Sequence, residues 1–361
     1  MQFKDIEVTK DHMKKVVKNI EYNSVIYDYY QRLLMNVDDI KVEKVLKQAK
    51  RLEDCNRFWL LDRYDKARIK DFKKTNLCND KFCNNCKKVK QAQRMAKFIP
   101  LIRPYRKDMY QITLTVPNVK GDKLKETIEG MFKSFGTLIR YMKGAKKLKG
   151  IEFEKWGFEG AIRSLEITFN NDEYHPHLHA LFVLKGDMNS SKHIMNTYSH
   201  DRYNKEVKRL FTDEEVLIQK IWKLLNTGKT VTKKAVESMK LGYSCTIDKF
   251  DEDDFLELFK YMTKSTSEDN SILTYEQFET LYYTLFKTRQ IQGYGCFYGL
   301  KDEDKISIEE VNEAYDGLIE SLKKEENPVE IAESPTELMK DKSYKIISRK
   351  KVGAFLRRLN K

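Results

Sequence analysis

The hydrophobic positions near the start of the chain recur with the spacing of a helix. They fall at Val25, Tyr29 and Leu33, and the pattern is interrupted near Asn36–Asp39. Apolar residues three or four positions apart form one face of an α-helix. We therefore expect residues 1–50 to form a helical N-terminal segment.

A different pattern begins at Tyr110. Apolar and polar residues alternate up to Val116, and strand-like runs return at 162–169 and 177–184. Alternation with a period of two is typical of a β-strand. The turn residues at 170–172 separate the last two runs, so these two strands are expected to form an antiparallel hairpin.

Helical patterns accompany these strands. They are found at residues 122–142, 213–226, 251–263 and 274–288, and a further short strand is predicted at 243–247. Helices and antiparallel strands in this mixture predict an α+β fold.

Composition divides the chain into four parts. After the helical segment 1–50 comes a basic, cysteine-rich segment, 51–104, that ends at two prolines. The predicted strands fall in a central domain of residues 105–300. Residues 301–361 form a tail with an acidic helical stretch, a polar segment and a basic end.

The chain is strongly basic. It has 361 residues with 68 Lys and Arg against 55 Asp and Glu, a formal net charge of +13. Such an excess favours a polyanionic partner such as nucleic acid. No run approaches the roughly 18 apolar residues of a membrane span, and the first residues are charged, without a secretory apolar core. A cytoplasmic protein with no membrane partner is expected.

Three of the six histidines lie close together, at 175, 177 and 179. Side chains two apart on a strand share a face, so His177 and His179 can hold one metal ion while their neighbours enter the core. Glu166 on the preceding strand is within reach across the hairpin. Two imidazoles and a carboxylate suit divalent-metal phosphoryl chemistry, although a structural zinc or zinc-hydrolase site would use the same spacing. His175 precedes Pro176 at the edge of the strand and ranks below the other two histidines as a ligand.

A second group of polar residues lies along the helix predicted at 251–263. Glu257, Tyr261 and Lys264 are spaced to share one face of it. A tyrosine hydroxyl can attack a metal-polarised phosphodiester, a lysine can stabilise the charge, and a glutamate can activate water. Alone, the pattern also fits an ordinary amphipathic helix.

Four cysteines gather in the basic segment. Cys78, Cys83 and Cys86 are closely spaced, and Cys55 precedes them by about twenty residues. Four thiolates at such spacings can hold one tetrahedral zinc. The basic run 87–94 follows, which either contacts phosphates or faces solvent. Cys245 and Cys296 lie in strand-like surroundings and are expected in the core, with no assigned role.

These motifs resemble those of a known family. The sequence Arg163-Ser164-Leu165-Glu166, then Tyr174-His175-Pro176-His177-Leu178-His179, then Glu257-x-x-x-Tyr261-x-x-Lys264, is similar to the Rep family of rolling-circle plasmid replication initiators, which are HUH endonucleases. The similarity extends over about residues 50–300. A later stretch, 287–295, resembles a glycine-containing strand of that family, with Gln292 and Tyr294 where small residues are usual.

The resemblance implies a central antiparallel sheet flanked by helices, with the histidines on a middle strand. It implies that His177, His179 and Glu166 bind Mg²⁺ or Mn²⁺, that Tyr261 is the nucleophile, and that Glu257 promotes the terminating hydrolysis. The implied partners are origin DNA, single-stranded DNA and a host helicase. A cysteine-rich segment before the first strand is also common in that family.

Two other functions remain open at this stage. A relaxase or single-tyrosine transposase of the HUH class would share the chemistry. A zinc-containing DNA-binding regulator without cleavage activity would use the basic surface alone, but it would leave the histidine pattern unexplained. Origin sequence, oligomeric state and the role of the tail are not given by the sequence.

Overall fold

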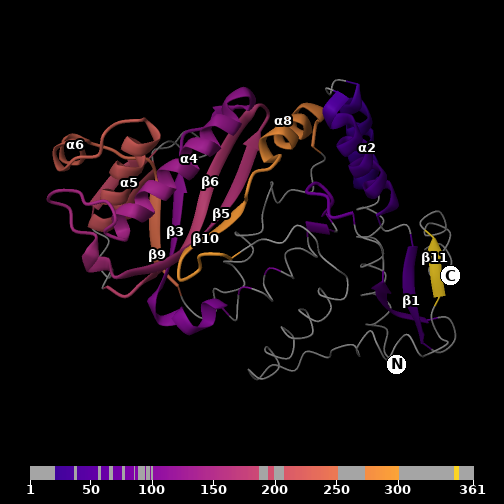
Figure 1. Cartoon of the computed structure of the whole chain (residues 1–361), viewed down its shortest axis with the longest axis horizontal. Helices are drawn as coiled ribbons and strands as arrows, with labels where there is room; N and C mark the ends of the chain where they lie inside the picture. The colour runs from indigo at the N-terminus through magenta and orange to yellow at the C-terminus, as the bar shows by residue number, and fades with distance from the viewer. Residues whose placement is uncertain are drawn as a thin grey trace. The chain divides into compact units, whose positions relative to one another are not determined.

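The structure is a computed structural model of the whole chain (Figure 1). It describes residues 21–35, 39–55, 58–64, 68–74, 78–84, 86–87, 94, 98, 101–186, 194–198, 207–250, 273–300 and 345–348. The chain divides into two compact units. The first comprises Met1–Ile99, Ile272–Tyr275 and Glu303–Lys361, and the second Pro100–Ser271 and Glu276–Asp302.

The second unit is built on a six-stranded antiparallel sheet. Its strands are β3 (Met109–Thr115), β4 (Val119–Lys120), β5 (Phe158–Asn170), β6 (Glu173–Leu184), β9 (Cys245–Lys249) and β10 (Ile291–Gly295). Their order is β10-β5-β6-β3-β9, and β4 pairs with β6. The hairpin of β5 and β6 turns at Asn171, whose φ of 53° is one that asparagine tolerates. The predicted central antiparallel sheet is confirmed, and β6 is its middle strand.

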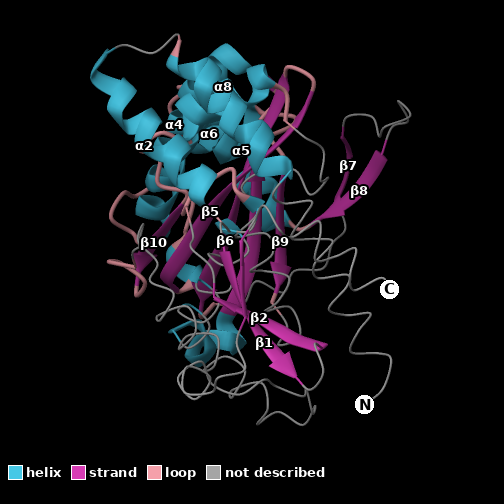
Figure 2. Ribbon diagram, turned by 90° about the vertical axis from the view of Figure 1, so that its right-hand side faces the viewer, coloured by secondary structure: helices cyan, strands magenta, loops and turns pink. Residues whose placement is uncertain are grey.

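Helices cover one face of this sheet (Figure 2). Phe135 of α4 (Gly121–Met142) packs against Phe182 of β6, with ring centroids 5.9 Å apart. Next to α4 lies α5 (Asp213–Asn226), in which the Trp222 Nε1 donates to the Thr115 carbonyl at 2.7 Å. The short α6 (Lys233–Ser238) follows, and α8 spans Tyr275–Leu285. The predicted helices at 122–142 and 213–226 are confirmed, and the one at 274–288 is slightly shorter.

The edge strand β10 is tied to β5 by a buried arginine. The Arg163 guanidinium donates to Gln292 Oε1 at 3.0 Å and to the Tyr294 hydroxyl at 3.2 Å. It also lies 3.5 Å from the centroid of the Phe132 ring. Gln292 and Tyr294, which replace the small residues usual in the Rep family, therefore accept hydrogen bonds from a buried cation.

Two glycines allow the chain after β10 to return over the other face. A Cβ atom at Gly293 would collide with the backbone oxygen of Phe297, and one at Gly160 with the sulfur of Cys296. Cys296 is exposed, which corrects the expectation that it is a core residue. It lies in the turn after β10, beyond the alternating pattern of the strand. Cys245, on β9, is fully buried as expected.

The first unit combines helices, a small sheet and the cysteines. Residues 21–34 form a helix, followed by α2 (Asp39–Asp54). The strands β1 (Phe58–Tyr64), β2 (Arg68–Lys74) and β11 (Lys345–Ser348) form an antiparallel sheet in the order β11-β1-β2. The four described residues of the tail are thus a strand, and the predicted acidic helical stretch of the tail lies outside the described residues.

The first helix buries a face one position away from the one marked by Val25 and Tyr29. Its buried apolar and aromatic residues are Tyr22, Ile26, Tyr30 and Leu33. The second unit also contains a separate two-stranded antiparallel sheet, formed by β7 (Ile194–Tyr198) and β8 (Val207–Phe211). These two strands were not predicted from the sequence. None of the described helices combines the length and the apolar run that crossing a membrane requires.

Candidate active site and cysteine centre

The register of three strands places the histidines beside Glu166. In the β5–β6 pair, Glu166 lies opposite His177 and Ser164 opposite His179. On the other side of β6, Thr113 of β3 lies opposite His179. Directly paired residues of antiparallel strands point to the same side of the sheet. The intervening Leu178 and Ala180 point to the other side and are fully buried, as the alternation predicted.

The carboxylate of Glu166 lies between the two imidazoles. Its Oε2 is 2.7 Å from His179 Nε2 and 3.7 Å from His177 Nε2. Glu166 and His179 are each 7% exposed. An ionised carboxylate only accepts, so the short contact is a hydrogen bond in which His179 Nε2–H donates. The structure therefore brings together all three residues predicted to be metal ligands.

Two threonine hydroxyls complete the surroundings of the histidines. Thr113 Oγ1 is 3.3 Å from His179 Nδ1, and Thr168 Oγ1 is 3.5 Å from His177 Nε2. Neither contact was predicted from the sequence, because the alternation of the strands was the only local signal for them. If His179 Nε2 bound a metal ion, Nδ1 would carry the ring proton and donate it to Thr113 Oγ1, and this contact would orient the ring.

The second histidine is held in its neutral form. Burial, together with the neighbouring His175, lowers the pKa of His177 to about 4. The ring centroids of His175 and His177 are 4.5 Å apart, and burial lowers the pKa of His175 as well. A neutral imidazole keeps a lone pair free for a metal ion. The ring nitrogens of His177 and His179 and the carboxylate oxygen of Glu166 are a donor set that fits a divalent cation.

The predicted nucleophile helix lies outside the described residues. Glu257, Tyr261 and Lys264 all fall within the undescribed stretch 251–272. Their assignments stay predictions, and the geometry of the site is that of the histidine face alone.

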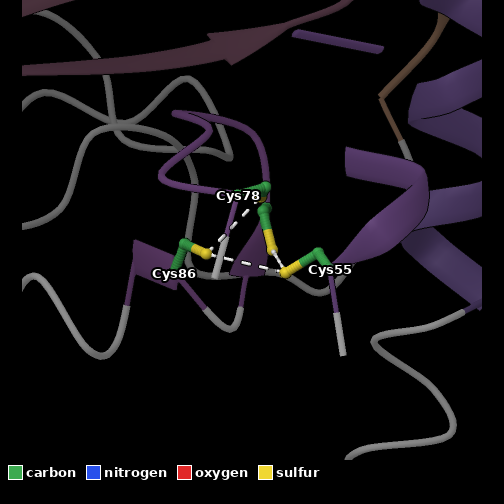
Figure 3. A group of neighbouring side chains, drawn as sticks. Cys55, Cys78 and Cys86 are labelled. Carbon is green, nitrogen blue, oxygen red and sulfur yellow. Dashed lines mark hydrogen bonds between the residues drawn. The ribbon is translucent and has the colours of Figure 1, made fainter. Parts of the chain in front are cut away.

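A second cluster of metal-binding groups lies in the first unit. The sulfur of Cys55 is 3.8 Å from that of Cys83 and 3.7 Å from that of Cys86, and the sulfurs of Cys78 and Cys86 are 3.4 Å apart. All four cysteines are buried, and the sulfur atoms lie within 4.8 Å of one another. Figure 3 shows the sulfurs of Cys55, Cys78 and Cys86 directed toward one another.

These separations fit one bound metal ion. Zinc–sulfur bonds of about 2.3 Å in a tetrahedron place the sulfurs about 3.8 Å apart. Hydrogen bonds from Cys55 and Cys78 lower the pKa of Cys83 well below its usual range, so one thiolate forms easily. The buried four-cysteine cluster could therefore hold a metal such as zinc.

Only two residues of the basic run 87–94 belong to the described chain. Arg94 is 7% exposed, so it neither faces solvent nor is available to phosphates. Burial lowers the pKa of Lys87 to about 8, while the charges of Asp80 and Cys83 oppose that shift. Arg94 is thus buried, while Lys87 is half-buried and lies close to Asp80 and Cys83.

Comparison with other proteins gives a consistent result. A family model described as "Replication protein" matches residues 69–344. A Staphylococcus aureus protein named "Protein rep" is 28% identical over 180 residues, covering 48% of this chain and 69% of the relative. A Bacillus amyloliquefaciens protein of the same name is 25% identical over 259 residues, covering 69% of this chain and 70% of the relative.

A third relative is matched over a smaller part of its length. The "Protein rep" of Lentilactobacillus hilgardii is 27% identical over 180 residues, and the chain spans about half of that protein, 54%. No solved structure is significantly similar to the chain.

Proposed function

Because the chain belongs to the replication protein family, whose model matches residues 69–344, we propose that it initiates rolling-circle plasmid replication by nicking one strand of origin DNA. The reaction uses Tyr261 as nucleophile and a divalent ion bound by His177, His179 and Glu166. The observation that carries the proposal is the convergence of these three ligands on one face of the sheet, with Glu166 Oε2 2.7 Å and 3.7 Å from the histidine nitrogens.

The ligand set suits Mn²⁺ and Mg²⁺ to different degrees. When bound, the ion polarises the scissile phosphate and neutralises charge on its oxygens. Magnesium prefers oxygen ligands in octahedral geometry, and two imidazole nitrogens depart from that preference. We therefore expect Mn²⁺ to bind more tightly than Mg²⁺. Thr113 keeps His179 oriented, and the buried Leu178 and Ala180 anchor the strand beneath it.

Strand cleavage proceeds by transesterification at phosphorus. The Tyr261 oxygen forms a bond to phosphorus as the bond from phosphorus to the 3′-oxygen breaks, and its proton passes to a base. The 3′-oxygen takes up a proton and leaves as a free 3′-hydroxyl. The 5′-phosphotyrosine retains the bond energy for later strand joining. Lys264 stabilises the anionic phosphorus centre, and Glu257 activates the water that hydrolyses the last intermediate.

Replication is favoured over the other functions considered. Family membership supports an initiator rather than a relaxase or transposase. A regulator without cleavage activity has no use for a buried His177–Glu166–His179 group. We further propose that the protein acts in the cytoplasm on plasmid DNA, with a host helicase that unwinds the nicked duplex.

The decisive experiment replaces the nucleophile. Tyr261→Phe removes the attacking oxygen, so nicking of a supercoiled origin plasmid should fall by at least about 10³-fold. Binding of the origin, measured by gel shift, should be retained. The wild-type protein should form a covalent adduct with a single-stranded origin oligonucleotide that maps to Tyr261.

Tyr298→Phe is the matched control, because Tyr298 is a tyrosine that is 86% exposed. It should nick and form the adduct like the wild type. Undiminished nicking by Tyr261→Phe, or an adduct at another residue, would contradict the assignment.

A further inference from the structure

The cysteine cluster is surrounded by hydrogen-bond donors that the sequence motifs did not include. Asn23, on the helix of residues 21–34, is 2% exposed, and its Nδ2 donates to Cys83 Sγ at 3.2 Å. The backbone N–H of Asp80 donates to Cys78 Sγ at 3.4 Å. Donors directed at sulfur are expected where the sulfur is an anionic thiolate, since a thiol is only a weak acceptor.

The orientation of the Asn23 amide also indicates that Cys83 is a thiolate. Among the described residues its Oδ1 has no hydrogen-bond partner, although the atom is buried. A neutral thiol at Cys83 could donate to that oxygen if the amide were turned over. With its nitrogen toward the sulfur, the amide leaves its oxygen without a hydrogen bond, but it presents an N–H donor that is complementary to a thiolate. This is the form in which cysteine binds a metal.

Asp80 joins the cysteine loop to two helices of the first unit. Its Oδ2 accepts from the Tyr30 hydroxyl at 2.7 Å and from Gln48 Nε2 at 2.6 Å. Its Oδ1 accepts from the Phe82 N–H at 2.7 Å. Tyr30 belongs to the helix of residues 21–34 and Gln48 to α2, which also carries the chain to Cys55. One carboxylate between Cys78 and Cys83 thus contacts two helices as well as its own loop.

We propose that the four cysteines hold a structural zinc ion for which Asn23 and Asp80 are positioning residues, so that zinc binding and docking of the two N-terminal helices are coupled. Asn23 stabilises the thiolate of Cys83 from the first helix. Asp80 fixes the Cys78–Cys83 loop against Tyr30 and Gln48. Both contacts are made only when the helices are in place, so each should strengthen the other. This inference is independent of the nicking reaction.

The first test changes Asn23 in the full-length protein. Asn23→Asp has nearly the same shape but replaces the N–H donor with an oxygen anion facing a thiolate. Zinc affinity, measured by competition with a chromophoric chelator, should fall by about 10- to 100-fold, the usual effect of losing an outer partner of a metal ligand. Asn23→Ala, which removes the donor without adding charge, should lie between this variant and the wild type.

Asn118→Asp is the matched control. Asn118 makes an exposed hydrogen bond to Glu173 in the second unit, so the same chemical change should leave zinc affinity unaltered. Cobalt substitution provides a spectroscopic reading, since thiolate-to-cobalt absorption should appear in the wild type and shift in Asn23→Asp. Absence of that absorption, or equal zinc affinities for wild type and Asn23→Asp, would overturn the proposal.

The coupling is tested by a variant that leaves the cysteines and their donors intact. Tyr30→Phe removes only the hydroxyl that donates to Asp80. Zinc affinity should fall several-fold, and hydrogen exchange of residues 21–34 and α2 should accelerate when zinc is chelated from the wild-type protein. Exchange in these helices that is insensitive to chelation would show that the docking does not depend on the metal.

Discussion

At the scale of single residues, Glu166 joins the two histidines of the candidate site, because its Oε2 lies 2.7 Å from His179 Nε2 and 3.7 Å from His177 Nε2. His177, His179 and Glu166 could be paired from the sequence because the hairpin is local and the period of a strand fixes which side chains share a face. Thr113 could not be found in this way. Its strand is 66 residues from His179, and only the β3–β6 register brings the two together.

The charge of Glu166 can be removed while its shape is kept. In Glu166→Gln the amide oxygen still accepts from His179, but the ligand set loses its negative charge. We expect the nicking rate at low Mn²⁺ to fall by about 10²-fold or more, because the ion supplies several kcal/mol of stabilisation. Raising the Mn²⁺ concentration should restore part of the activity, and EDTA should abolish it in both proteins.

A suitable control lies on the same strand. Glu159→Gln changes an acidic residue of β5 whose partner is the exposed Lys185, and it should nick normally. The role of Glu166 as a metal ligand would be refuted by a Glu166→Gln protein whose Mn²⁺ dependence matches the wild type.

At the scale of elements, the helices and strands that could be predicted from the sequence are those with strong local patterns. Thr212-x-x-Glu215 is a capping box before an apolar helical pattern, and α5 begins and ends as predicted. The strands β1 and β2 carry mixed and charged residues without clear alternation, so they were missed. The strand β11 pairs with β1 from almost three hundred residues away, a contact that no local pattern encodes.

The capping glutamate also binds the strand β9, a contact that the capping box does not predict. Glu215 is fully buried, its Oε2 accepts from the Thr212 N–H at 2.8 Å, and its Oε1 accepts from the Ile247 N–H at 2.9 Å. One carboxylate therefore fixes both the start of α5 and the edge strand β9. The helix is held beside the sheet by backbone groups as well as by apolar packing.

Removing this carboxylate should be costly. Glu215→Ala leaves two N–H groups without partners, at about 1–3 kcal/mol each, so the free energy of unfolding should fall by about 2–6 kcal/mol. Thr212→Ala, which loses only the cap, should cost about 1 kcal/mol. Urea denaturation followed by tryptophan fluorescence measures both, because Trp222 lies on α5.

The control for this series is Glu237→Ala. Glu237 forms an exposed ion pair with Lys233 on α6, and such pairs contribute less than about 1 kcal/mol. Similar losses in Glu215→Ala and Glu237→Ala would mean that the link from α5 to β9 contributes little.

At the scale of the whole molecule, the net charge of +13 suits a protein that binds DNA. The structure shows where part of this charge is available. Lys143, Lys146, Lys147 and Lys149 follow α4 and are all exposed. Near the start of α4 the lysines have acidic neighbours instead, since Lys120 pairs with Asp172 and Lys123 with Glu126. Net charge alone does not distinguish these two groups.

Two triple variants with the same change in charge can separate them. Replacing Lys146, Lys147 and Lys149 with glutamine should weaken non-specific duplex binding. It should also reduce the slope of log affinity against log salt by up to about 2.7, at roughly 0.9 per phosphate contact. Replacing Lys120, Lys123 and Lys125 should reduce the slope by less, because Lys120 and Lys123 already have acidic partners in the protein. Fluorescence anisotropy over a salt series measures both slopes. If the two variants lose affinity and slope equally, DNA responds to the total charge of the protein, and the segment after α4 is not a preferred contact surface.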